Sequence, residues 1–203
     1  MMDDQTFNSS MDSDDQFWFE NVRKGDERAF EILFKKYYLQ LTRFAWRYVN
    51  SKAIAEELVQ DLLATLWENR EEWDMKNEKT IRTYLYKSVK NMSLNYIKHQ
   101  KIRDKYDAEW IEKKDNTKYD YSDTHREEEI REAISRAVEE LPPRSKMTYK
   151  LHRYDGLTYD EIGEVMEVSV KTVESQMSRT LKILRERLSY LLPIILLSMM
   201  FSF

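Results

Sequence analysis

Apolar residues recur at spacings of three and four through most of this 203-residue chain. That spacing puts them on one side of an α-helix, so it predicts helices that pack through a single face. Faces of this kind begin at Phe30, Ile54, Ile81 and Ile130. The chain has three glycines and three prolines, too few for the many turns of a β-protein. The pattern therefore predicts an all-α fold.

One stretch without any sustained period divides the helical pattern in two. Residues 104–128 are rich in Asp, Glu, Lys, Tyr and Ser, and a structureless stretch of that length is uncommon inside one domain. We therefore expect two helical modules, over residues 16–103 and 129–190, joined by a flexible linker. Residues 1–15 are acidic and polar, and they should form a disordered tail.

The composition excludes several kinds of chemistry. The chain has no cysteine, so it has no disulfide, thiolate metal site or cysteine nucleophile. Its three histidines lie far apart in the sequence, and its isolated glycines form no phosphate-binding loop. We expect a protein that is not an enzyme, with no cofactor, no metal site and no small-molecule substrate.

Positive charge is concentrated in two segments of a chain whose net charge is −4. Residues 78–105 contain eight basic and two acidic residues, and residues 170–187 contain five basic and two acidic residues. Two separated basic segments on an acidic chain indicate two local contacts with a polyanion. Ordinary solvated helix faces would give the same charge pattern.

The second basic segment belongs to a predicted helix-turn-helix over Leu157 to Lys182. Thr158 and Glu161 have the spacing of a capping box, Gly163 permits close helix approach, and Ser169 can cap the second helix. In this motif the second helix enters the DNA major groove; the alternative is a plain helical hairpin with a solvated polar face. The residues off the apolar stripe that could contact bases and phosphates are Lys171, Thr172, Glu174, Ser175, Ser178, Arg179 and Lys182.

The first basic segment interleaves cations with aromatic residues, which is typical of proteins that bind single-stranded nucleic acid. Asparagine amides in the same predicted helix could hydrogen-bond an exposed base edge. Tyr84 and Tyr96 also lie on the apolar stripe, so they could simply be core residues. The candidate contacts are Arg82, Tyr84, Lys87, Asn91, Asn95, Tyr96 and Lys98.

A third candidate surface lies on the predicted helix that begins near Ile54. Acidic and amide side chains there share the helix with a broad apolar face, which suits docking against a basic helical partner. An ordinary amphipathic helix would show the same spacing. The residues concerned are Glu56, Glu57, Gln60, Asp61 and Trp67.

Four stretches along the chain carry a family resemblance. They are GDERAFEILF with the following Tyr37–Tyr38, residues 55–67, residues 83–91 with Asn95–Tyr96, and residues 141–144, 156–163 and 169–180. In that order they resemble the start of region 2, the polymerase-binding segment, the strand-opening segment and region 4 of sigma-70 family transcription initiation factors. The absence of the family's regions 1 and 3 points to group 4, the extracytoplasmic-function (ECF) sigma factors.

The resemblance implies a bacterial, cytoplasmic sigma factor that binds core RNA polymerase and promoter DNA. Region 2 would melt the −10 element and capture an unstacked base, with Trp73 and Asn91 as candidates, and region 4 would read the −35 element as duplex. The family's usual further partner is an anti-sigma factor, often membrane-spanning, which could hold the protein at the inner membrane. Many family members have Trp where Tyr84 stands, and the tyrosine keeps the capacity to stack on a base. Many have Arg where Glu174 and Gln176 stand, so the −35 sequence read here should differ from the usual one.

The apolar C-terminal tail, residues 191–203, carries no charge. It is shorter than the about 20 residues of a membrane span, and Pro193 interrupts it. We expect it to pack on the preceding module or on a partner. Two other readings of the chain remain: a helix-turn-helix regulator that acts without polymerase, and a membrane-associated interaction protein that depends on this tail.

Overall fold

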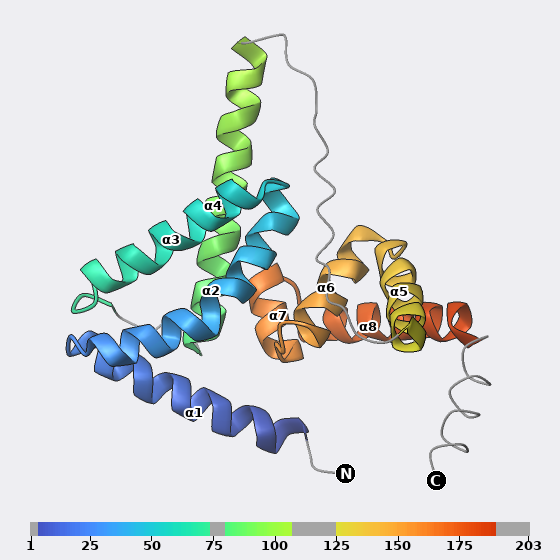
Figure 1. The fold of residues 1–203 in the computed structure, drawn as a ribbon, viewed down its shortest axis with the longest axis horizontal. Coiled ribbons are helices and arrows are strands. Elements are labelled where there is room, and N and C mark those ends of the chain that lie inside the picture. Colours follow the sequence, from blue (N-terminus) through green and yellow to red (C-terminus); the bar gives the residue numbers. More distant parts are fainter. Residues whose placement is uncertain (1–3, 74–79, 107–124, 190–203) are drawn as a thin grey trace. The chain divides into compact units, whose positions relative to one another are not determined.

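The computed structural model describes residues 4–73, 80–106 and 125–189, and these residues form eight α-helices and no strand (Figure 1). The chain divides into two compact units, Met1–Asn116 and Thr117–Phe203. The predicted all-α architecture with two helical modules is confirmed.

The first unit is built around α2, which packs against the other three helices. Leu33 and Phe44 of α2, Leu63 of α3 and Leu85 of α4 are all buried in its core. Asp26 caps α2 through its carboxylate, and Asn50 ends the helix in the left-handed conformation. The helices of this unit are α1 (Asp4–Arg23), α2 (Glu27–Val49), α3 (Lys52–Glu68) and α4 (Ile81–Tyr106).

The prediction of a disordered tail over residues 1–15 is corrected for residues 4–15, because α1 begins at Asp4. Asp15 is 2% exposed. Its Oδ1 lies 2.5 Å from Lys36 Nζ, and its Oδ2 accepts a hydrogen bond from the Tyr37 hydroxyl. A carboxylate can be buried at low cost only when paired and hydrogen-bonded in this way. The partners belong to α2, so the acidic composition of the segment did not reveal them.

The burial of Tyr37 predicts an alkaline weakness of the first unit. Burial and the neighbouring Asp15 carboxylate raise the pKa of the Tyr37 hydroxyl well above its ordinary value. The folded state therefore keeps this proton at pH values where the unfolded state has lost it. The contribution of this hydroxyl to the free energy of unfolding is fully present below about pH 10, the ordinary tyrosine pKa. It is lost as the pH rises from there toward the higher pKa of the folded state. Urea unfolding between pH 8 and 11 should show a steeper loss of unfolding free energy in the wild type than in Tyr37→Phe; equal slopes would contradict this.

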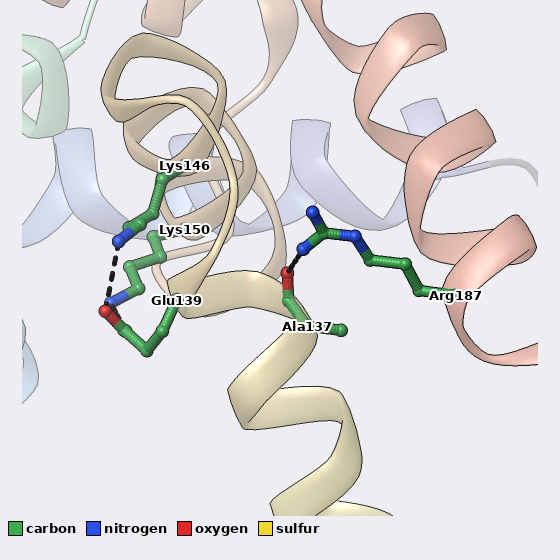
Figure 2. Close-up of polar contacts among 5 residues, drawn as sticks. All are labelled: Ala137, Glu139, Lys146, Lys150 and Arg187. Atoms are coloured by element: carbon green, nitrogen blue, oxygen red, sulfur yellow. Dashed lines mark hydrogen bonds and ion pairs between the residues drawn. The ribbon is translucent and has the colours of Figure 1, made fainter.

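The second unit consists of α5 (His125–Glu139), α6 (Pro143–Arg153), α7 (Tyr159–Met166) and α8 (Val170–Arg187). Val138 and Leu141 meet Leu184 of α8 in one buried cluster. Glu139 accepts hydrogen bonds from Lys146 (3.1 Å) and Lys150 (2.6 Å), and Arg187 donates to the Ala137 carbonyl oxygen at 3.4 Å (Figure 2). These contacts join α5 to α6 on one side and to α8 on the other.

Helix α4 continues to Tyr106 and α5 begins at His125, so helical backbone extends into both ends of the predicted linker, residues 104–128. Residues 107–124 lie outside the described part of the chain, and so does the apolar tail, residues 191–203. The expectations for the flexible linker and for the packing of the tail remain predictions.

Candidate nucleic-acid interface

The helix-turn-helix in the second unit is held by local capping. Thr158 Oγ1 accepts from the Glu161 N–H (3.2 Å), and Glu161 Oε2 accepts from the Thr158 N–H (2.8 Å). Ser169 Oγ accepts from the Thr172 N–H (3.2 Å) at the start of α8. The predicted capping box and the predicted cap of the second helix are both confirmed.

The turn between α7 and α8 depends on Gly163. A Cβ atom at this position would lie 3.0 Å from the Val168 carbonyl oxygen, and the Val168 N–H donates to the Gly163 carbonyl oxygen at 2.9 Å. Glu167 ends α7 in the left-handed conformation, with φ of 56°. The backbone therefore passes directly over the glycine, as its position in the sequence predicted.

Helix α8 presents a polar face to solvent. Val173, Met177 and Leu184 are buried on its inner side. Gln176, at the border, is half-buried and accepts a hydrogen bond from Thr148 Oγ1 at 2.6 Å, so its side chain is directed toward α6. All seven residues predicted to contact duplex DNA are exposed: Lys171, Thr172, Glu174, Ser175, Ser178, Arg179 and Lys182.

Helix α4 gathers most of the other predicted DNA contacts on one face. Tyr84, Lys87, Asn91, Asn95 and Lys98 follow one another at spacings of three and four, so they lie along one side of the helix. Asn91, Asn95 and Lys98 are exposed, whereas Tyr84 and Lys87 are half-buried. We call these five residues the α4 face.

Tyr96 lies off the α4 face, and its hydroxyl accepts a hydrogen bond from Gln100 Nε2 at 2.7 Å. Arg82 is 4% exposed and lies in the core close to Tyr37. This burial contradicts the prediction that Arg82 contacts DNA, because a guanidinium enclosed by the helices cannot reach a phosphate. The positions of basic residues along the helix could not distinguish the buried Arg82 from the exposed lysines, since the environment of Arg82 is set by α1 and α2.

Trp73 and Tyr84 form an aromatic pair at the start of α4. Their ring centroids lie 4.3 Å apart with an interplanar angle of 62°. Both side chains are half-buried, so part of each ring is open to solvent. The structure thus joins a residue of the loop after α3 to the first turn of α4.

Acidic and amide side chains line the outer side of α3, where Glu57, Gln60 and Asp61 are exposed. Glu56 is half-buried and lies 3.7 Å from Lys52. Trp67 is half-buried, with its ring 5.0 Å from that of Phe30 and the Arg70 guanidinium 4.7 Å from its centroid.

Sequence reasoning missed an aromatic row on α2 beside this surface. Phe34 and Tyr38 stack with centroids 5.0 Å apart, and Phe30 lies 6.2 Å from Phe34. Gln60 Nε2 donates to the Tyr38 hydroxyl at 3.3 Å. The three rings are half-buried. Their spacing of four was visible, but it predicted only a buried helix face.

The described residues contain no group of His, Cys, Asp and Glu that could hold a metal ion. Within the same part of the chain, no helix combines the length and apolar character that a membrane crossing requires.

Comparison with known proteins identifies both units. Residues 33–102 match the family model described as Sigma-70 region 2, and residues 131–184 match that of Sigma-70 region 4. The ECF RNA polymerase sigma-E factor of Escherichia coli K12 is 30% identical over 174 residues, covering 81% of this chain and 89% of the relative. The RNA polymerase sigma-H factor of Pseudomonas aeruginosa is 26% identical over 187 residues, which cover 88% of this chain and 95% of that relative.

Solved structures agree in fold. CnrH, in complex with the cytosolic domain of CnrY, has a TM-score of 0.54 at 20% identity and covers 87% of this chain and 98% of its own. The sigma factor RpoE of Bartonella quintana, in complex with the anti-sigma factor NepR, has the same TM-score and identity. That match covers 79% of this chain and 96% of RpoE. With both sigma regions matched in order, the chain belongs to the sigma-70 family as an ECF sigma factor, a transcription initiation factor that directs RNA polymerase to promoters.

Proposed function

We propose that this sigma factor divides promoter recognition between its two units, with α8 reading the −35 element as duplex and the α4 face binding the separated −10 strand. The observation that carries the proposal is the polar face of α8, on which all seven predicted residues are exposed. A helix held through one side in a helix-turn-helix, with donors and acceptors on the other, fits the major groove.

The α4 face supports the second half of the proposal. Single strands are bound by cations on phosphates and by flat side chains on unstacked bases. Lys87 and Lys98 supply the cations, Asn91 and Asn95 supply amides, and the Trp73–Tyr84 pair supplies partly open rings. Removing a base from the stack costs a few kcal/mol, and this site offers several contacts that can offset that cost.

We assign docking on core RNA polymerase to the outer side of α3 together with the aromatic row of α2. The exposed residues Glu57, Gln60 and Asp61 would face a basic helical partner, and the half-buried rings of Phe34 and Tyr38 would supply apolar area beside them. Aromatic residues contribute strongly to interfaces because they bury large area at low entropic cost.

Substituting Glu57, Gln60 and Asp61 together with alanine tests this assignment. We expect affinity for core polymerase at low salt to fall about fivefold, since each partly solvated polar contact contributes a few tenths of a kcal/mol. Run-off transcription should fall with it. The control is Glu132→Ala, an exposed acidic residue on α5. Unchanged polymerase binding by the triple variant would remove the main support for this docking surface.

A regulator that acts without polymerase is not favoured, because region 2 is matched over residues 33–102. We further propose that the protein works in the cytoplasm and is restrained by an anti-sigma factor. The support is that structures of CnrH and RpoE, which share this fold, were solved with CnrY and NepR.

A further inference from the structure

Helix α1 reaches the start of α4 through a row of aromatic rings. The Phe19 ring lies 5.7 Å from that of Trp73, which in turn lies 4.3 Å from that of Tyr84. Phe19 is 1% exposed, whereas Trp73 and Tyr84 are half-buried. The inner ring of the row therefore belongs to α1, and the two outer rings are those open to solvent.

Trp73 needs such support because it lies outside any helix. Helix α3 ends at Glu68 and α4 begins at Ile81, so Trp73 lies in the connection between the two helices. Its backbone is not held by a helical hydrogen-bond ladder, so ring packing is what orients its side chain. Aromatic pairs of this kind contribute about 0.5–1.5 kcal/mol beyond the area they bury.

A buried charge cluster fixes α1 close to the row. Asp15 and Phe19 are four residues apart, so they share one face of α1. The Asp15 carboxylate engages Lys36 Nζ at 2.5 Å and the Tyr37 hydroxyl on α2. Arg82, the second residue of α4, is buried close enough to Tyr37 to influence it electrostatically. Three helices therefore meet at this cluster, which sets the depth at which Phe19 inserts.

We infer that Phe19 is a positioning residue for base capture, holding Trp73 against Tyr84 in the arrangement that receives the unstacked base, with Asp15 anchoring the helix that carries Phe19. This inference rests on the proposed role of the α4 face. A pair of rings already oriented before DNA arrives avoids the entropic cost of ordering them during capture. Phe19 contacts no DNA itself and acts through Trp73.

The chain contains a matched control, because Phe17 lies on the same helix and is 59% exposed. Holoenzyme formed with full-length Phe19→Leu or Phe17→Leu would be assayed on a duplex fragment carrying a start site mapped by run-off transcription with the wild type. Permanganate reactivity measures opening. We expect Phe19→Leu to reduce it about fivefold, the effect of losing one aromatic pair, and Phe17→Leu to leave it unchanged.

A second template separates positioning from a general folding defect. On the same fragment with a mismatched bubble across the −10 element, run-off transcription by Phe19→Leu should recover to within about twofold of wild type, since part of the unstacking cost is removed. Polymerase binding should be unaltered. Equal loss on both templates, or a parallel loss of polymerase binding, would overturn the inference. If Phe19→Leu does not fold, Phe19→Met fills the same space without a ring and receives the same two tests.

The variant Tyr84→Ala separates the positioning role of Phe19 from the proposed role of the α4 face in base capture. Normal opening by Tyr84→Ala would mean that the α4 face does not capture a base, and both would fall. Impaired opening by Tyr84→Ala with normal opening by Phe19→Leu would leave the α4 face in place and refute only the positioning role.

Discussion

Replacing Arg179 with alanine should weaken binding to the −35 duplex by about 1–3 kcal/mol, or roughly 5- to 150-fold. Arg179 is exposed on the outer face of α8, in the third turn after the Ser169 cap. Arginine can donate two hydrogen bonds to one guanine, and losing such a pair removes both affinity and discrimination. Glu174, which is also exposed on α8, repels phosphates, so much of the attraction on this face has to come from its cations.

Footprinting of holoenzyme at fixed salt would measure the Arg179 effect. Arg185→Ala is the matched control, since it removes an exposed arginine farther along the same helix. A base contact predicts that Arg179→Ala loses selectivity among −35 variants, whereas a phosphate contact predicts uniform weakening with a smaller salt dependence. An unchanged −35 footprint would refute any role for Arg179 in reading the duplex.

Replacing Gly163 with valine should destabilise the second unit by about 1–3 kcal/mol through overpacking. The first added carbon already lies 3.0 Å from the Val168 carbonyl oxygen, and Val170 lies just beyond. The obstacle is backbone in a tight turn, which cannot rotate away as a side chain can. Separating α7 from α8 to make room would also tilt the polar face of α8, so −35 binding should fall together with stability.

Urea unfolding followed by helical circular dichroism would measure the Gly163 effect. Glu164→Val places the same β-branched residue one position along α7, where the side chain is half-exposed. It should destabilise the second unit less than Gly163→Val does, because helix propensity accounts for only a few tenths of a kcal/mol. Similar destabilisation by the two variants would show that the turn tolerates a side chain at Gly163.

The sequence by itself determined the features that depend on neighbours within a few residues. The capping box of Thr158 and Glu161, the cap at Ser169 and the glycine under the α7–α8 turn were all predicted and are present. So was the polar face of α8, because helical periodicity alone decides which residues oppose Val173 and Met177.

Only the tertiary structure decided which charges and rings remain accessible. Arg82 and Asp15 read as solvated charges, yet both are buried where α1, α2 and α4 meet. The Trp73 ring packs between Phe19 and Tyr84 only because α1 places Phe19 beside it. A side chain's exposure and electrostatic environment depend on helices distant in sequence, and periodicity along one helix carries no information about what packs against it.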